Sequence, residues 1–435
     1  MSGLALVAIL TILFGMGVYV AASMGVGGLI LVTLFGDRPI WDVFGYVPWN
    51  TTTSFTLVAL PLFILMGEVL LRSGVTDRMY EVLSKWLNPL PGGLLHSNIA
   101  ACAMFSCISG SSAATAATIG RVALPFLKRY RYDERVSLGS IVAGGTLGIL
   151  IPPSIVMIIY GVLVEESIGK LYLAGFVPGL VMTFMFMLVI GFMSLRSASV
   201  APKAPSSPWR EKLVGLVALL PIVVLMGLVL GTIYAGVATA TEAAAFGVVG
   251  AFAIAALNRR LSLAMLRDTF LATAGTTSMI MFILIGAFVL QFVLAFLGLP
   301  AMISNWVIGL ELSPLQVVLM ICVLYIVLGT FMEELSMMVT TIPIFLPMLH
   351  ALGIDLVWFG VIVVMLVQIA IVSPPVGMNL FILHAQRRDL AAPGEEPSIA
   401  DVFLGVLPFF AVMIVTLALI IAFPQIAMWL PGTSN

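Results

Sequence analysis

GGTLGILIPPS, at residues 144–154, is the stretch that decides how this chain folds. Two consecutive prolines remove two backbone donors, so upstream carbonyl groups lose their helical partners. The glycines before them permit an unwound backbone. A second stretch, AIVSPPVG at residues 370–377, repeats the double proline. We therefore expect two broken membrane helices, at 136–163 and 358–385, whose free carbonyl groups are suited to a hard cation such as sodium. Two structural kinks are the alternative.

The composition requires a membrane. Of the 435 residues, 61% are hydrophobic and 9% are charged, whereas soluble domains carry about 25% charged residues. The N-terminal apolar run has no basic region before it, which favours a retained helix over a cleaved signal peptide. Segments long enough to cross ~30 Å of hydrocarbon are expected at 3–21, 24–36, 51–73, 136–163, 171–195, 213–232, 233–257, 269–297, 358–385 and 399–424.

Two further apolar stretches, 94–127 and 314–349, are too long for one helix and carry a polar break near the middle. We interpret both as re-entrant hairpins, which are tolerated at membrane depth where protein or a water-filled cavity covers the break. The first tip, SCISGSSA at 106–113, carries four hydroxyl groups that either bind a ligand or hold helices together. The second tip ends in Glu333-Glu334, two carboxylates that are either functional or solvated.

The distribution of Lys and Arg supports this topology. If both hairpins return to the face from which they enter, all four basic clusters fall on the cytoplasmic side; they lie at 128–135, 196–212, 259–267 and 387–388. Residues 2–36 are uncharged, and we expect a break at Gly25, Gly27 and Gly28 that splits them into two helices. Both termini are then periplasmic.

The chain contains an internal repeat. Thr118 precedes Pro125 by 7 residues, and Thr340 precedes Pro347 by 7. The double proline follows 27 residues after Pro125 and 27 residues after Pro347.

This repeat divides the chain into a first half, a linker and a second half. The first repeat, 1–198, comprises scaffold helices 3–73, hairpin 94–127, broken helix 136–163 and helix 171–195. A cytoplasmic linker follows at 199–212. The second repeat, 213–435, comprises scaffold helices 213–297, hairpin 314–349, broken helix 358–385 and helix 399–424. Because the halves start on opposite faces, the fold predicted is an all-α polytopic membrane protein with an inverted-topology repeat, two re-entrant hairpins and two broken helices, typical of transporters.

The sequence resembles the large membrane subunit of tripartite ATP-independent periplasmic (TRAP) transporters over essentially its whole length. The motifs that carry the resemblance are SGSSA at 109–113, IPPS at 151–154, AGFVPG at 174–179, TATEA at 239–243, PPVG at 374–377 and NLF at 379–381. The resemblance implies an elevator mechanism driven by sodium, in the bacterial inner membrane. It also implies a soluble periplasmic binding protein that delivers a small carboxylate-bearing solute, and a small four-helix membrane subunit, expected here as a separate chain.

The resemblance also implies two sodium sites, formed mostly by backbone carbonyl groups. The first would use Ser109, Ser111, Gly148, Ile151 and Pro153, and the second Gly329, Ala370, Ser373 and Val376. We predict that the transported anion binds between the tips and the broken helices, near Ser111, Ser112, Pro153, Glu334 and Asn379. The family usually has one aspartate at the second tip, where this chain has Glu333-Glu334.

Two other functions are compatible with the sequence. A self-sufficient elevator symporter of anions and sodium would share the hairpins but need no binding protein. An intramembrane enzyme would need a base beside Ser109 or Ser111, yet the histidines, His96, His350 and His384, lie near expected membrane edges. We therefore expect a transporter with no catalytic site and no cofactor, and with sodium as the coupling ion. Its solute could be a dicarboxylate, a sugar acid or a keto acid.

Overall fold

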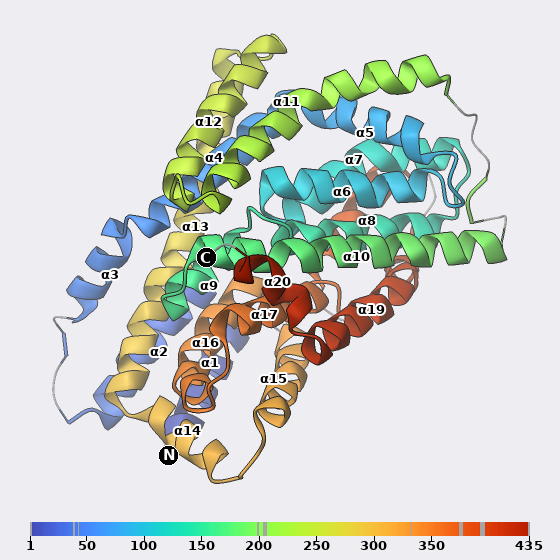
Figure 1. Ribbon diagram of the computed structural model, residues 1–435. Coiled ribbons are helices and arrows are strands. Elements are labelled where there is room, and N and C mark those ends of the chain that lie inside the picture. Colours follow the sequence, from blue (N-terminus) through green and yellow to red (C-terminus); the bar gives the residue numbers. More distant parts are fainter. Residues whose placement is uncertain are drawn as a thin grey trace.

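A computed structural model describes residues 2–37, 40–41, 43–197, 200–202, 207–330, 332–373, 377–391 and 396–433. These residues form helices joined by turns, with no strand among them (Figure 1). Seven helical segments in the described ranges are long and apolar enough to cross a membrane, or eight if one bent pair is counted as a span.

The first half contains ten α-helices among the described residues. They are α1 (Ser2–Gly15), α2 (Val20–Phe35), α3 (Val43–Thr53), α4 (Ala59–Arg72), α5 (Val75–Leu87), α6 (Leu94–Ser109), α7 (Ser112–Arg129), α8 (Glu134–Leu150), α9 (Ile155–Val164) and α10 (Ile168–Arg196). The predicted hairpin is the pair α6 and α7, and the predicted broken helix is the pair α8 and α9.

The described part of the second half repeats this order. Its helices are α11 (Trp209–Tyr234), α12 (Ala240–Leu257), α13 (Leu263–Phe296), α14 (Leu299–Ile308), α15 (Pro314–Gly329), α16 (Glu334–Ala351), α17 (Leu356–Ala370), α18 (Met378–Asp389), α19 (Ile399–Ala422) and α20 (Gln425–Gly432). The second hairpin is α15 with α16, and the second broken helix is α17 with α18. The predicted linker, 199–212, falls partly outside the described residues, and α11 already begins within it.

Repeat-related residues meet at the centre of the molecule. Ser112 donates a hydrogen bond to Glu334, and Gln368 donates one to the Thr146 carbonyl; each pair is 222 residues apart in sequence. Pro125 and Pro347 have the same separation. Residues that contact their own repeat equivalents must lie close to the axis that relates the halves. The pseudo-two-fold axis therefore runs between the hairpin tips and between α8 and α17.

The break predicted near the N-terminus is in the wrong place. Gly25, Gly27 and Gly28 lie inside the continuous helix α2, and the chain turns instead at Gly17, whose φ is +75°. Gly25 and Gly28 allow a close approach to α13, because a Cβ on Gly28 would lie 3.5 Å from the Leu290 Cα, whereas Gly27 faces Leu10 of α1. Helix packing rather than unwinding explains them, as for small residues between other membrane helices.

The glycines before the first double proline are also helical, contrary to the unwinding expected there. The helix α8 continues to Leu150, and only the four residues 151–154 interrupt it. A Cβ on Gly145 would lie 2.7 Å from the Ala116 Cβ, and one on Gly148 would lie 2.6 Å from the Ser111 carbonyl oxygen. These glycines let α7 pack directly on α8.

The scaffold segment predicted as one helix at 51–73 is bent. The helix α3 ends at Thr53, a short 3₁₀ helix follows at Thr56–Val58, and α4 runs at 59° to α3. Thr51 and Thr53 donate side-chain hydrogen bonds to the carbonyl groups of Val47 and Trp49, both at 2.8 Å. Such back-bonding competes with the helical hydrogen-bond pattern near the bend.

The structure contains two short helices that the sequence does not predict. The helices α5 and α14 stand at equivalent places, immediately before the hairpin of each half. The α5 sequence is amphipathic, with Asp77, Arg78, Glu81 and Lys85. In each half this short helix connects the scaffold to the hairpin and packs against it, α5 on α6 and α14 on α16.

Candidate functional site

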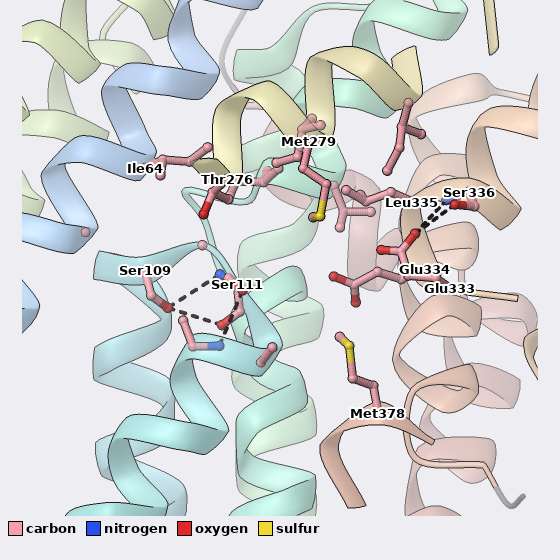
Figure 2. Close-up of a pocket in the computed structure, with 18 of the residues that line it drawn as sticks. Ile64, Ser109, Ser111, Thr276, Met279, Glu333, Glu334, Leu335, Ser336 and Met378 are labelled. Carbon is pink, nitrogen blue, oxygen red and sulfur yellow. Dashed lines mark hydrogen bonds between the residues drawn. The ribbon is translucent and has the colours of Figure 1, made fainter. Parts of the chain in front are cut away.

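A cavity of about 550 Å³ lies between the scaffold and the two hairpin tips. The scaffold side is formed by the start of α2 and by α4 and α13, and the opposite side by residues 109–111 and 113–114, the start of α9 and residues 333–336. Figure 2 shows Ser109 and Ser111 on one side of this space and Glu333 and Glu334 facing them from the other.

The first tip concentrates oxygen atoms in a short turn. Gly110 adopts the left-handed conformation, with φ +59°, between α6 and α7. The Ser109 hydroxyl lies 2.8 Å from the Thr115 hydroxyl, which in turn donates to the Ser111 carbonyl at 2.8 Å. The Ser111 side chain caps α7 by accepting a hydrogen bond from the Ala114 N–H. Several hydroxyl and carbonyl oxygens thus surround one turn.

The break in the first broken helix touches this tip. The Ile155 N–H donates to the Gly110 carbonyl at 3.4 Å, and a Cβ on Gly110 would lie 2.9 Å from the Pro153 carbonyl oxygen. Gly148 faces the Ser111 carbonyl from α8. Ile151 lies in the same break and is buried, with its N–H bonded to the Leu147 carbonyl. The fold therefore gathers the residues of the first expected sodium site around one junction.

The second junction brings together part of the corresponding set. Gly329 ends α15 against Ala370, so closely that a Cβ on Gly329 would collide with the Ala370 Cβ. The Ser373 N–H donates to the Ala370 carbonyl at 3.1 Å, and the Ser373 carbonyl accepts from the Gly377 N–H at 3.0 Å. Val376, the remaining predicted residue, lies outside the described residues, as do the two prolines before it.

The predicted solute-binding residues divide into two groups. Ser111 and Glu334 line the cavity, whereas Ser112, Pro153 and Asn379 are buried behind its wall. Ser112 reaches the site through its 3.3 Å hydrogen bond to the Glu334 Oε2. Asn379 is fully buried in the first turn of α18, and both polar atoms of its amide lack a hydrogen-bond partner among the described residues.

The sequence prediction missed the scaffold wall of the cavity. Glu68 of α4 lines it and forms an ion pair with Arg72, one turn further along the same helix. Thr276 and Met279 of α13 line it opposite the tips (Figure 2). The carboxylate of Glu68 within an apolar segment is a sequence signal for a functional position, but the contribution of α13 depends on tertiary packing.

A larger cavity of about 1220 Å³ lies on the other side of the second tip, between α1, α15, α16 and α18. Glu333, Glu334 and Met378 line both cavities, together with Tyr19 and Val20 from the start of α2. The second tip and the break between α1 and α2 therefore form the partition between the two spaces.

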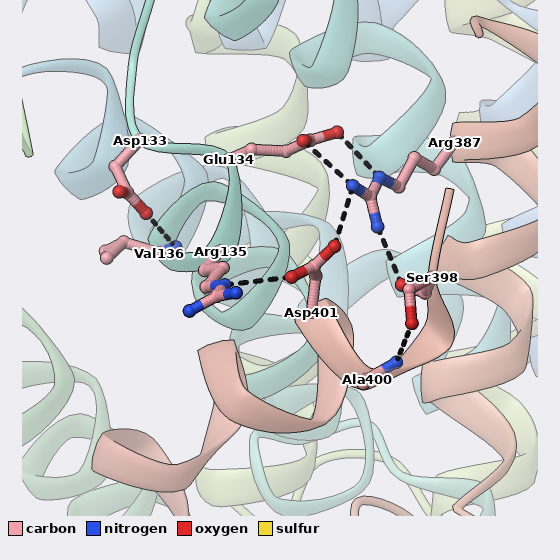
Figure 3. Close-up of polar contacts among 8 residues, drawn as sticks. All are labelled: Asp133, Glu134, Arg135, Val136, Arg387, Ser398, Ala400 and Asp401. Carbon is pink, nitrogen blue, oxygen red and sulfur yellow. Dashed lines mark hydrogen bonds and ion pairs between the residues drawn. The ribbon is translucent and has the colours of Figure 1, made fainter. Parts of the chain in front are cut away.

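Ion pairs connect α8, α18 and α19 at one end of the molecule, where the sequence predicts the cytoplasmic face (Figure 3). The Arg387 guanidinium of α18 donates to both carboxylate oxygens of Glu134 at 2.6 and 2.9 Å and to Asp401 at 3.0 Å. Arg135 donates to the other oxygen of Asp401 at 2.9 Å. This network joins the ends of α8, α18 and α19.

Comparison with known proteins gives consistent relatives. The family described as "Tripartite ATP-independent periplasmic transporter, DctM component" matches residues 7–426. The C4-dicarboxylate TRAP transporter large permease protein DctM of Pseudomonas aeruginosa is 33% identical over 416 residues, which cover 94% of each chain. The sialic acid TRAP transporter large permease protein SiaM of Vibrio cholerae is 32% identical, covering 87% of this chain and 86% of that relative.

Two further similarities concern a longer relative and the fold. The isethionate TRAP transporter permease protein DctMQ of Oleidesulfovibrio alaskensis is 32% identical over 97% of this chain and 66% of its own length. The crystal structure of the YdaH transporter of Alcanivorax borkumensis superposes with a TM-score of 0.61 at 16% identity, covering 97% of this chain and 99% of that one. The relatives named are transporter permeases rather than enzymes, which confirms the prediction of a transporter. The chain is a multi-pass membrane protein that belongs to the DctM family of TRAP transporter large permeases.

Proposed function

We propose that this chain takes up a small carboxylate-bearing solute across the bacterial inner membrane by sodium-coupled secondary transport. The observation that carries the proposal is the 550 Å³ cavity between two repeat-related hairpin tips. A cavity at a repeat interface, bounded by interrupted helices, is where secondary transporters bind their solutes. The names of the relatives, which refer to C4-dicarboxylates, sialic acid and isethionate, support a small organic acid.

Sodium coupling is supported by the donor atoms at the first junction. Ser109, Ser111 and Thr115 offer hydroxyl and carbonyl oxygens within one turn, and the Pro153 carbonyl approaches the same turn. Hard cations prefer oxygen ligands of this kind, and unwound carbonyl groups coordinate sodium in other transporters. We propose the second cation site at Gly329, Ala370, Ser373 and Val376.

An elevator movement is supported by the arrangement around the second tip. Glu333 and Glu334 border both cavities. If the hairpins and broken helices moved relative to the scaffold, the solute could pass from the cavity on one side of the second tip to the cavity on its other side. The short helices α5 and α14 connect the scaffold to the hairpins at equivalent places in the two halves. In this proposal both termini are periplasmic, a soluble periplasmic protein delivers the solute, and a small membrane subunit completes the transporter.

The test is uptake into proteoliposomes that contain this chain and its small membrane subunit. With the soluble partner supplied, an inward sodium gradient should drive uptake, and a proton gradient alone should not. Full uptake driven by protons without sodium would reject the coupling. Omitting the soluble partner separates this mechanism from a self-sufficient symporter, because only the latter would retain its uptake rate.

A further inference from the structure

Among the described residues that line the cavity between the tips, the two glutamates without an ion pair lie on one side. The first tip contributes the neutral side chains of Ser109 and Ser111, and the second tip contributes Glu333 and Glu334. The repeat equivalents of these two glutamates, 222 residues earlier, are Ser111 and Ser112, which carry no charge. Among the described residues that line the cavity there is no Lys, Arg or His.

The third carboxylate of the cavity is already neutralised. Glu68 on the scaffold side forms an ion pair with Arg72 of the same helix. Glu333 and Glu334 have no ion pair in the described part of the chain. Glu333 accepts hydrogen bonds from the Ser336 N–H and hydroxyl at 3.1 and 2.9 Å, which are neutral donors.

The environment of Glu334 is the evidence for a ligand in this cavity. Glu334 is only 8% exposed, and among the described residues its carboxyl group has a single hydrogen bond, which Ser112 donates to Oε2 at 3.3 Å. The other oxygen, Oε1, has no donor among the described residues, while the side chain lines the cavity in Figure 2. An ionised carboxylate removed from water is costly unless a cation or strong donors compensate it, and without them it takes up a proton. A solute with only negative charges would increase that cost.

We propose that the solute of this chain is a zwitterion, a small carboxylate that also carries an ammonium group, and that Glu334 together with Glu333 binds the ammonium. This rests on the proposed function, because it takes the cavity as the solute site. The carboxylate of the solute then lies toward the opposite side, where Ser111 caps the N-terminal end of α7 and favours negative charge. Glu334 thereby determines specificity for solutes with separated charges, a class to which the names of the relatives given above do not refer.

The first measurement identifies the solute. The soluble binding protein that serves this transporter is isolated without added ligand, and the solute that it retains is identified by mass spectrometry. A solute with a basic nitrogen and a carboxylate is expected. A solute without a basic nitrogen would overturn the proposal.

The second measurement tests Glu334 with a matched pair of ligands, the identified solute and its analogue with a hydroxyl in place of the ammonium. Their apparent affinities for the purified membrane complex follow from the ligand-induced rise in melting temperature in saturating sodium. In the unmodified chain the analogue should bind roughly ten-fold or more weakly, since a hydrogen bond to a charged group is lost. In Glu334→Gln the two ligands should bind within about two-fold of each other.

The control variant is Glu311→Gln. Glu311 is exposed and lies away from the cavity, so this variant should keep the full difference in affinity between the solute and its hydroxyl analogue. If Glu334→Gln weakens both ligands equally, the carboxylate holds the tip or a sodium ion and not the ammonium, and the proposal fails. Because these affinities need no ion gradient, they separate this inference from the coupling mechanism. A failure of sodium-driven uptake would reject the proposed function and leave the charge discrimination measurable.

Discussion

The Ser112 hydroxyl donates to the Glu334 Oε2 at 3.3 Å across 222 residues of sequence, which is the spacing of the internal repeat. Each residue begins the second helix of its hairpin. The two tips therefore meet at the pseudo-two-fold axis, and a structural change at either tip should affect the position of the other.

Removing the hydroxyls of the first tip should weaken the response to sodium. In Ser109→Ala/Ser111→Ala, the backbone carbonyl of Ser111 remains but the side-chain oxygens are gone. The half-saturating sodium concentration for uptake should rise by about three- to ten-fold, as expected for the loss of one or two hydrogen-bonding groups. Ser106→Ala is the matched control, because among the described residues that hydroxyl bonds only to the Cys102 carbonyl of its own helix. An unchanged sodium dependence in the double variant would exclude both side chains as ligands.

Gly148→Ala should destabilise the junction between α7 and α8. Its Cβ would lie 2.6 Å from the Ser111 carbonyl oxygen and 2.9 Å from the Thr115 hydroxyl, and the helices would have to separate. Overpacking of this kind costs about 1–3 kcal/mol, visible as a lower melting temperature and slower uptake. Gly191→Ala in α10 is the comparison, because no atom of the described residues lies within 4 Å of a Cβ there. Equal melting temperatures for the two variants would contradict the predicted clash.

Asn379→Leu should separate function from stability. The amide of Asn379 is fully buried and has no hydrogen-bond partner in the described residues, so a leucine of similar volume should leave the melting temperature unchanged or raise it. Uptake should nevertheless fall if the amide binds solute or ions during transport. In contrast, Gln368→Leu removes the 2.8 Å hydrogen bond to the Thr146 carbonyl and should cost about 1 kcal/mol of stability. Normal uptake by Asn379→Leu would remove this residue from the mechanism.

The orientation of the hairpins can be tested by chemical labelling. In a background without Cys102, Cys107 and Cys322, single cysteines at Lys85 and Lys128 should react only with reagents that reach the cytoplasm. They flank the first hairpin, so labelling from one face means that the hairpin returns to the side it entered. A cysteine at Glu311 should react from the periplasm. Labelling of the Lys85 and Lys128 variants from opposite faces would reject the topology.

The sequence predicts where the helices break better than it predicts the role of the residues around each break. Proline pairs and hydroxyl-rich tips locate the breaks at 151–154 and 110–111, because proline and small polar residues act on their own backbone. The role of Gly148 cannot be predicted in this way. A glycine either unwinds a helix or allows a neighbouring segment to pack closely, depending on the tertiary contacts at that position, and at Gly148 the Ser111 carbonyl group packs against the helix. The same limit applies to Glu68, whose place in the cavity is set by how the scaffold meets the tips.

The meeting of Ser112 with Glu334 makes the two halves of the chain non-interchangeable. An exact dimer of the second half would bring two buried carboxylates together at this point, and like charges there would repel. An exact dimer of the first half would pair two serines and leave the cavity without the acidic pair. Donor and acceptor must come from different halves, so a chimera built from two copies of either half should not reproduce the site.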